Sequence, residues 1–316
     1  MIMDVTNLTR ELFSRLEAES IRGRAIAIQH LPDLHEDIED LHKQGLLDEN
    51  FYQEWLTGFR YTPPENLPEA KSIIVVAVPQ PQTQVTFSWK GEIIPLVVPP
   101  TYLHSKEVIQ RLESLLKEIL AQYGYQATYA VLPLKLLAAR SGLSRFGRNN
   151  ISYVDGIGSF YRIAAFYSDL PCQEDSWQNV QLMERCQQCS ACIQECPTRA
   201  IGDDRFLLYA ERCLTYLNEK PGDVAFPSWV DYAWHNCLVG CLFCQKICPQ
   251  NKKYLNWIEV GVEFSEEETL LMLQRVPLDQ LSSNTVDKLT QDNLVDFLDV
   301  IPRNLEAILI RDGKMK

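Results

Sequence analysis

The sequence has no long apolar segment. Its longest apolar runs, residues 72–78 and 132–139, are bounded or interrupted by Pro, Lys or Arg. Both are far shorter than the roughly 20 residues that a membrane-spanning helix requires. The N-terminus also lacks the pattern of a signal peptide, because Met1 leads directly into a charged amphipathic segment. We therefore expect a cytoplasmic protein without membrane segments.

Basic residues are scarcer than acidic residues. The chain has 30 Lys and Arg against 42 Asp and Glu, which gives a formal net charge of −12. This charge opposes general nucleic-acid binding unless basic residues gather on one face. Apart from two cysteine runs, the sequence contains neither an internal repeat nor a low-complexity segment. Its 316 residues, 46% of them hydrophobic, are enough for two or three folded domains.

Cysteines, in contrast, are concentrated in one stretch. Nine of the ten lie from Cys186 to Cys248, and all but Cys213 and Cys237 of these nine belong to two runs. The first run, residues 186–197, has the C-x2-C-x2-C-x3-C-P spacing of bacterial ferredoxins. The second run, residues 241–249, repeats this pattern without its first position, and Cys213 lies between the two. In such a run three cysteines curl around one 4Fe-4S cube, and the cysteine before proline can bind the other cube.

This spacing predicts two 4Fe-4S clusters with four thiolates each. The first cluster takes Cys186, Cys189, Cys192 and Cys248, and the second takes Cys196, Cys213, Cys241 and Cys244. Structural zinc usually has paired C-x2-C units, which does not explain three consecutive cysteines at this spacing. Disulfides would suit a secreted chain, which the N-terminus does not indicate. We interpret Cys172 and Cys237 as plain thiols, although Cys237 could compete with Cys213.

Apolar periodicity predicts helices and strands on both sides of the cysteine stretch. Before it, we expect helices over residues 4–20 and 106–121 and strands over residues 25–28, 73–78 and 160–167. After it, a capping box that begins at Ser265 and further short apolar patterns predict helices over residues 269–273, 293–301 and 304–310. We therefore expect residues 256–316 to form a short helical segment.

Residues 133–150 combine a helix, a turn and a polar loop. The Leu and Ala residues predict a helix that ends at Gly142, which suits the left-handed conformation of a C-cap. Gly147 allows a sharp turn or the close approach of a ligand, and Arg148 and Asn149 offer hydrogen-bond donors beside it. Local chemistry leaves both a ligand-binding loop and an ordinary turn open.

The loop from Arg140 to Asn150, which reads R-S-G-L-S-R-F-G-R-N-N, resembles epoxyqueuosine reductase when taken with the eight cysteines. The loop of that family reads approximately R-A-G-L-G-W-I-G-K-N-T. The proline turn after Arg60 also looks like the family's R-x-x-P segment. Pro302-Arg303-Asn304-Leu305 is similar to the start of an R-N repeat in the family's tail. The resemblance covers nearly the whole chain and is strongest over residues 133–255.

The resemblance implies an oxidoreductase that uses cobalamin and two 4Fe-4S clusters. That family reduces the epoxide of epoxyqueuosine in tRNA during queuosine biosynthesis, and it is related to the reductive dehalogenases. The implied fold class is α+β, with an α/β cobalamin-binding domain over 1–180, a ferredoxin-like domain over 181–255 and a helical segment over 256–316. The residues implied to hold cobalamin are Arg60, Arg140, Gly142, Leu143, Phe146, Gly147, Arg148 and Asn149.

The sequence departs from the family pattern in two places. The family has an aspartate, taken as the proton donor to the opening epoxide, about a dozen residues before the Arg of the loop. Here no Asp or Glu occurs between Glu118 and Asp155. Tyr129 lies in the corresponding stretch and is our candidate catalytic residue, because a phenol can donate a proton. The chain also stops where the family continues into helical repeats that help to grip tRNA.

Several partners and two other functions stay open. We expect an external electron donor of the ferredoxin or flavodoxin type, and a small molecule, a modified nucleoside or the corrinoid of another protein as substrate. Transfer RNA is a candidate that the charge does not favour. One alternative is a two-cluster electron-transfer protein, which leaves about 170 residues before the clusters without a role. The other is a corrinoid reductase or binding protein without epoxide reduction, which the absent aspartate favours.

Overall fold

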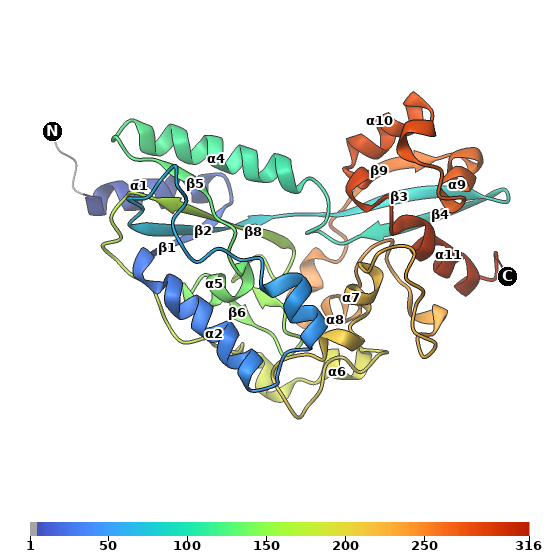
Figure 1. Cartoon of the computed structure of the whole chain (residues 1–316), viewed down its shortest axis with the longest axis horizontal. Helices are drawn as coiled ribbons and strands as arrows, with labels where there is room; N and C mark the ends of the chain where they lie inside the picture. Colours follow the sequence, from blue (N-terminus) through green and yellow to red (C-terminus); the bar gives the residue numbers. More distant parts are fainter. Residues whose placement is uncertain (1–4, 316) are drawn as a thin grey trace. The chain divides into compact units, whose positions relative to one another are not determined.

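The computed structural model describes residues 5–315 and divides into two compact units (Figure 1). The first unit contains the described residues up to Pro79, together with Ser105–Ser190 and Arg205–Leu207. The second contains Gln80–His104, Ala191–Asp204 and the described residues from Leu208 onward. Each unit has its own sheet and its own apolar core.

The first unit is built on a four-stranded antiparallel sheet. Its strand order is β1 (Arg22–Ala27), β2 (Ser72–Pro79), β8 (Tyr161–Ser168) and β5 (Ala127–Tyr129). In the central pair, Val75 lies opposite Ala165. The residues of β2 from Ser72 to Val78 are all buried, because helices cover both faces of the sheet. The strands predicted over residues 25–28, 73–78 and 160–167 correspond to β1, β2 and β8.

The two faces of this sheet carry different helices (Figure 1). On one face, α1 (Val5–Ala18) and α4 (Ser105–Ala121) pack around Ile74 and Phe166. On the opposite face, α2 (Leu31–Lys43) and α5 (Leu134–Arg140) pack around Val75. Neighbouring residues of one strand therefore contribute to different cores, as the alternation of side chains along a strand requires. The helices predicted over residues 4–20 and 106–121 are confirmed as α1 and α4.

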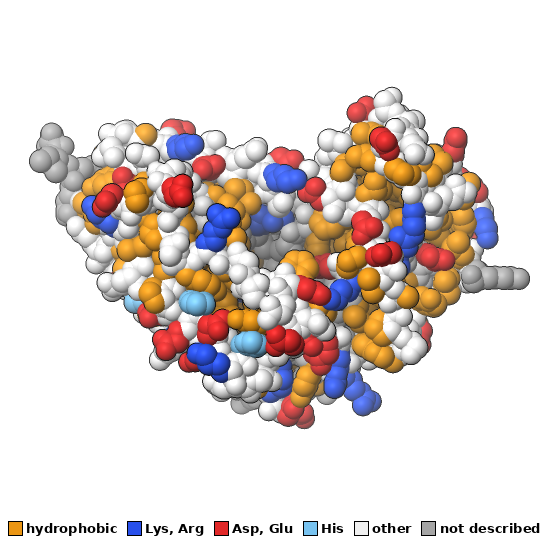
Figure 2. Space-filling view, viewed as in Figure 1, with side chains coloured by type: hydrophobic (Ala, Val, Ile, Leu, Met, Phe, Trp, Pro, Cys, Tyr) orange, Lys and Arg blue, Asp and Glu red, His pale blue; other side chains and the backbone are white. Residues whose placement is uncertain are grey.

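Shorter elements complete the first unit. They are a 3-10 turn (Ile28–His30), α3 (Glu49–Phe51), a π-helical turn (Tyr52–Leu56), the hairpin strands β6 (Arg145–Phe146) and β7 (Ser152–Tyr153), and a 3-10 turn (Glu184–Gln188). Figure 2 shows acidic and histidine side chains gathered over α2. This surface is negatively charged and does not favour contact with nucleic-acid phosphates.

The second unit has a three-stranded sheet of order β4 (Glu92–Val98), β3 (Gln82–Trp89) and β9 (Ile258–Phe264). The pairing of β3 with β4 is antiparallel, and the pairing of β3 with β9 is parallel. Side chains from α9 (Glu266–Leu273), α10 (Ser283–Gln291) and α11 (Ile301–Arg311) complete its core. The capping box at the start of α9 is confirmed, because Ser265 and Glu268 each bond the backbone N–H of the other.

Elements that carry or flank the cysteines are short. They are α6 (Ala191–Glu195), α7 (Leu214–Asn218), α8 (Phe243–Lys246), and 3-10 turns at Ala210–Arg212, Tyr232–Trp234 and Pro249–Tyr254. Near the C-terminus, 3-10 turns follow at Leu278–Gln280 and Leu294–Phe297. Among residues 5–315, no helix combines the length and the apolarity needed to cross a bilayer.

Two expectations about organisation differ from the structure. Residues 256–316 are not wholly helical, because the alternating residues of β9 form a parallel edge strand beside β3. The same pairing groups residues 80–104 with the C-terminal part of the chain and not with residues 1–180. A long-range strand pairing of this kind leaves no local signal in the sequence. The short helix predicted over 293–301 is a 3-10 turn at Leu294–Phe297, and α11 begins at Ile301.

Candidate functional site: the 142–149 loop and the cluster cysteines

Helix α5 ends as the sequence predicts. Gly142 has a φ of +71°, and its N–H donates to the carbonyl of Ala139 at 3.1 Å. The N–H of Ser144 donates to the carbonyl of Ala138 at 3.0 Å, which completes the hydrogen bonding of the last helical turn. Leu143 is buried in the core on the α2 and α5 face of the sheet. The loop therefore begins from a rigid helix end on that face.

Gly147 lies at the tip of the hairpin formed by β6 and β7. A Cβ at this position would stand 2.5 Å from Asn149 Oδ1 and 2.6 Å from Tyr153 Cε2. The Asn149 side-chain amide donates to the hydroxyl of Tyr153 at 2.9 Å, and its oxygen accepts from the N–H of Ile151 at 3.3 Å. Gly147 is thus required for packing within the loop, and the polar atoms of Asn149 bond to that same hairpin.

Three hydrogen bonds join this loop to the segment that carries the first cysteines. The N–H of Phe146 donates to the carbonyl of Gln181 at 2.9 Å, and the N–H of Met183 donates to the carbonyl of Phe146 at 2.8 Å. Nη2 of Arg148 donates to the backbone carbonyl of Cys186 at 2.8 Å. Because all of these residues belong to the first unit, the loop fixes the backbone at the first cysteine of the ferredoxin-like run.

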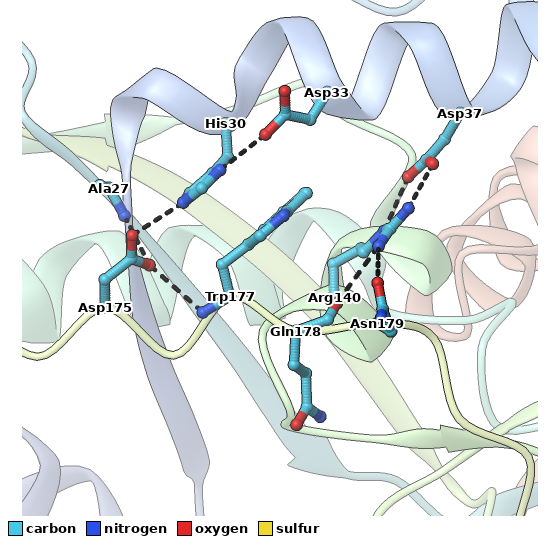
Figure 3. A network of polar contacts seen from close by, with 9 residues as sticks. All are labelled: Ala27, His30, Asp33, Asp37, Arg140, Asp175, Trp177, Gln178 and Asn179. Carbon is cyan, nitrogen blue, oxygen red and sulfur yellow. Dashed lines mark hydrogen bonds and ion pairs between the residues drawn. The ribbon is translucent and has the colours of Figure 1, made fainter.

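Arg140 holds the chain that leads to the cysteines (Figure 3). Its guanidinium makes a bidentate ion pair with Asp37 of α2, with Nε 2.8 Å from Oδ2. Nη1 donates to the carbonyl of Gln178 and to Oδ1 of Asn179, and the guanidinium lies over the ring of Trp177. These contacts make Arg140 a clamp between α5, α2 and residues 177–179. These hydrogen bonds of the Arg140 guanidinium are all made to other residues of the same protein, which indicates a structural role for the side chain.

His30 supports the same segment from the other side (Figure 3). Its Nδ1 lies 2.7 Å from Asp33 Oδ2 and its Nε2 lies 2.7 Å from Asp175 Oδ2. The ring also stacks on Trp177 with centroids 4.3 Å apart. Asp175 accepts in addition from the backbone N–H of Ala27 at 3.3 Å. The residues of Figure 3 therefore form a structural network that anchors residues 175–179 to β1 and α2.

Arg60 and Tyr129 occupy different places in the first unit. Arg60 has an exposed side chain, while its backbone accepts from the hydroxyl of Tyr167 at 2.9 Å. Tyr129 packs edge-on against Phe166 in the core on the α1 and α4 face. Leu143 belongs to the core on the opposite face. The structure thus does not bring the Tyr129 side chain together with the loop, and its catalytic role stays a prediction.

A buried hydroxyl on the loop's face of the sheet has no hydrogen-bond partner among residues 5–315. Tyr61 packs against the core that contains Leu143, and no described group hydrogen-bonds its hydroxyl. Burial raises the pKa of Tyr61 above that of an ordinary phenol, so the group is a neutral donor at physiological pH. A buried donor of this kind can bond to a polar group of a bound cofactor, and this fits the prediction that cobalamin binds on the face that carries the loop.

Three of the four cysteines predicted for the second cluster lie close together. Burial and, to a smaller extent, the neighbouring Cys213 and Cys196 thiols raise the pKa of Cys241 to about 11. The fourth, Cys244, is carried by α8, which packs against α6, the helix that immediately precedes Cys196. The iron atoms of a cube would stabilise these thiolates, since a coordinated thiol is deprotonated. The donor set therefore fits a 4Fe-4S cluster.

The cysteines predicted for the first cluster are divided between the two units. Cys186 and Cys189 belong to the first unit, while Cys192 and Cys248 belong to the second, so their common cluster stays a prediction. Among the described residues, no three His, Cys, Asp or Glu side chains are placed to hold a single metal ion. The thiolates of a cube bind separate iron atoms and stand farther apart than the ligands of one ion.

The remaining two cysteines differ in burial. Cys172 is half-buried, and burial raises its pKa to about 11. Cys237 is fully buried, and its thiol donates to Oδ1 of Asn236 at 2.9 Å. Because Cys213 and not Cys237 neighbours both Cys196 and Cys241, the structure favours Cys213 as the ligand.

Our sequence interpretation missed that Arg303 stabilises a helix next to the cysteines predicted for the second cluster. This buried guanidinium donates to the carbonyls of Leu217 at 3.0 Å and Asn218 at 3.1 Å, at the end of α7. It also lies over the ring of Phe226. Since Cys213 is the residue at the N-terminal end of α7, Arg303 supports the helix that carries this ligand. The Arg-Asn pair at 303–304 was the available signal, but only the resemblance drew attention to it.

Comparison with known proteins agrees with this geometry. Residues 185–251 match the family described as a 4Fe-4S double cluster binding domain. Epoxyqueuosine reductase of Staphylococcus aureus is 25% identical over 232 residues, which cover 70% of this chain and 58% of that protein. The enzyme of Pseudomonas aeruginosa is 32% identical over 156 residues, which cover 47% of this chain and 41% of that protein. The chain is thus similar in sequence to epoxyqueuosine reductases.

Solved structures show the same fold. Epoxyqueuosine reductase from Bacillus subtilis has a TM-score of 0.71 and 20% identity, over 98% of this chain and 83% of that chain. The enzyme from Streptococcus thermophilus has a TM-score of 0.68 and 18% identity, over 96% and 81%. The predicted resemblance, the α+β fold class and the double 4Fe-4S domain are thereby confirmed. The chain's matches span about half the length of the curated relatives.

Proposed function

We propose that this chain is an iron-sulfur, cobalamin-dependent reductase of the epoxyqueuosine reductase type. The observation that carries the proposal is the combination, in one chain, of the double 4Fe-4S match at residues 185–251 with an additional α+β unit. The whole has the fold of epoxyqueuosine reductases. A simple electron carrier needs no such unit, whereas a reductase needs it to hold a second cofactor and a substrate.

In this proposal, the first unit holds cobalamin at the loop. The backbone at Gly142, Leu143, Phe146 and Gly147 would line the site, with Arg60 and the Tyr61 hydroxyl as donors. Arg140, Arg148 and Asn149 act by fixing the loop, because their side chains bond to their own unit. Cobalamin when bound supplies a cobalt centre that passes electrons to the substrate, while the protein supplies orientation and protons. Two 4Fe-4S clusters held by the eight cysteines would supply those electrons from an external donor of the ferredoxin or flavodoxin type.

The proposed substrate is a modified nucleoside in a tRNA stem loop. A solved epoxyqueuosine reductase contains an epoxyqueuosine-modified tRNA stem loop, and its fold matches 98% of this chain with a TM-score of 0.69. The net charge of −12 and the acidic surface over α2 require that phosphates be met by a local basic surface elsewhere. Because no Asp or Glu occurs between Glu118 and Asp155, the proton would come from Tyr129 or from solvent.

A substrate assay tests this proposal. The chain, reconstituted anaerobically with iron, sulfide and cobalamin and supplied with reductant, is incubated with an epoxyqueuosine-modified tRNA stem loop. The nucleoside is then analysed by mass spectrometry. Loss of the epoxide oxygen, dependent on cobalamin and absent in the Cys213→Ser variant, is the expected result. An intact epoxide with both cofactors bound would remove this substrate from the proposal.

A second candidate function is a corrinoid reductase or corrinoid-binding protein without epoxide chemistry. The observation that favours it is the placement of Tyr129 in the core on the sheet face opposite that of Leu143, in a stretch without any carboxylate. Such a protein would bind cobalamin and reduce it, yet it would leave the epoxide unchanged in the same assay.

A further inference from the structure

Asn236 contacts the sulfur of a predicted cluster ligand in the second unit. Its Nδ2 lies 3.3 Å from Sγ of Cys241 and 3.2 Å from the carbonyl of Trp234. Its Oδ1 accepts from the backbone N–H of Leu242 at 3.0 Å and from the thiol of Cys237 at 2.9 Å. A single side-chain amide therefore contacts the predicted ligand Cys241, the next residue Leu242, and Cys237, which is one of the two cysteines not assigned to a cluster.

The orientation of this amide is fixed by its neighbours. A backbone N–H can only donate, so the atom that faces the N–H of Leu242 must be the amide oxygen. The NH2 group must then face the Cys241 sulfur, and the carbonyl of Trp234 can accept its other proton. The reversed amide would place two donors together at Leu242 and leave the carbonyl of Trp234 facing another acceptor.

We propose that Asn236 is a positioning residue for the second 4Fe-4S cluster, and that its N–H···S hydrogen bond to Cys241 raises the reduction potential of that cluster. Hydrogen bonds to cluster sulfurs are one of the features that set such potentials. Reduction adds an electron and makes the sulfurs more negative, so a donor stabilises the reduced cluster more than the oxidised one. Cys237 acts through Asn236, because its thiol donates to the amide oxygen and helps to hold the orientation. The inference rests on the cluster assignment within the proposed function.

Two substitutions separate this effect from a structural one. Asn236→Asp keeps an oxygen for the N–H of Leu242 but replaces the donor to sulfur with a second oxygen. Asn236→Leu removes the donor without adding charge. Asn256→Asp, at an exposed position of the same unit, is the control for the change of charge. Cys237→Ser keeps a hydroxyl donor to Asn236 and tests whether Cys237 is a ligand.

The experiment is a redox titration of the reconstituted chain, followed by electron paramagnetic resonance, with iron and sulfide counted in parallel. At a pH where the carboxylate is ionised, we expect one of two cluster potentials to become more negative in Asn236→Leu and further so in Asn236→Asp. The other potential serves as an internal standard and stays unchanged. Asn256→Asp and Cys237→Ser should keep both potentials and the full iron content.

Each other outcome has a definite meaning. Unchanged potentials in both Asn236 variants with full iron content would overturn the inference, as would equal shifts of both clusters. If Asn236→Leu loses iron, the Asn236→Asp variant decides, because it preserves the contact with Leu242. Loss of iron in Cys237→Ser would make Cys237 a ligand and contradict its assigned role. An unaltered chain that takes up no iron would overturn the cluster assignment itself, together with this inference.

Discussion

The Arg148 guanidinium donates a hydrogen bond to the backbone carbonyl of Cys186, with Nη2 and the oxygen 2.8 Å apart. The contact ties the loop to which we assign cobalamin to the first cysteine of the ferredoxin-like run. Both residues belong to the first unit, so the link does not depend on the arrangement of the two units. It gives a physical route by which a change in the loop reaches the first cluster.

Arg148→Met should therefore weaken the first cluster. A hydrogen bond from a charged group contributes about 1.5–3 kcal/mol, and its loss leaves the Cys186 carbonyl without this donor. We expect faster release of iron to a chelator from one cluster, followed by optical absorption. Arg145→Met is the matched control, because Arg145 has an exposed side chain in the same loop. Equal release rates in the two variants would show that the contact does not stabilise the cluster.

Gly147→Ala should destabilise the loop even without cobalamin. The added methyl group would meet Asn149 Oδ1 and Tyr153 Cε2 at 2.5 and 2.6 Å. Overpacking of this kind costs about 1–3 kcal/mol, which thermal unfolding of the cluster-loaded protein can measure. Gly58→Ala is the control, since a methyl group added at Gly58 would meet no heavy atom within 4 Å beyond its chain neighbours. A Gly147→Ala variant as stable as the Gly58→Ala variant would contradict the packing described here.

Cys196→Ser should damage one cluster and spare the other. Cys196 lies near Cys213 and Cys241, although it belongs to the same sequence run as Cys186, Cys189 and Cys192. Iron analysis and electron paramagnetic resonance should show loss of the cluster held by Cys213, Cys241 and Cys244. Cys172→Ser should retain both clusters. Loss of both clusters in equal measure from Cys196→Ser would contradict the crossed ligation.

Acid should destabilise the second unit through His235. Neither ring nitrogen of this buried residue has a described partner. Burial, together with the nearby Arg303 and Arg311, lowers its pKa from 6.5 to about 4. The unfolded chain binds the proton at a higher pH than the folded chain, so stability is complete above pH 6.5 and falls toward pH 4.

Within that pH window, the free energy of unfolding should fall by about 1.4 kcal/mol for each unit by which the pH is lowered. Thermal unfolding between neutral and mildly acidic pH should show this fall in the unaltered protein, and His235→Leu should reduce it. His35→Leu, at a side chain that is 55% exposed, is the matched control. An identical pH dependence in the unaltered protein and in His235→Leu would show that this residue does not titrate on unfolding.

Local sequence signals predicted much of the fold and the double 4Fe-4S domain. The cysteine spacing, the αL glycine at Gly142 and the capping box at Ser265 each depend on residues only a few positions apart. Contacts over long distances were not predictable in this way. Arg140 meets Asp37 across 103 positions, and β9 pairs with β3 from the far end of the chain.

Tyr129 shows what such reasoning leaves open. Its position in the chain matches the stretch in which the family carries its aspartate. The face of the sheet to which its side chain points, however, depends on its place in the alternation of side chains along β5. Tyr129 and Phe166 face α1 and α4, whereas Leu143 packs on the other side of the sheet. Strand alternation could be read from the sequence, but which helices cover each face could not.

The central claim is that one chain holds two 4Fe-4S clusters and a corrinoid. Its most direct test is anaerobic reconstitution with iron and sulfide, followed by titration with cobalamin, with iron per chain and the cobalt absorption and paramagnetic resonance spectra recorded. The account predicts a full complement of iron for two clusters and one cobalamin per chain with a shifted spectrum. Full iron content with no bound cobalamin would contradict it and leave an iron-sulfur electron carrier.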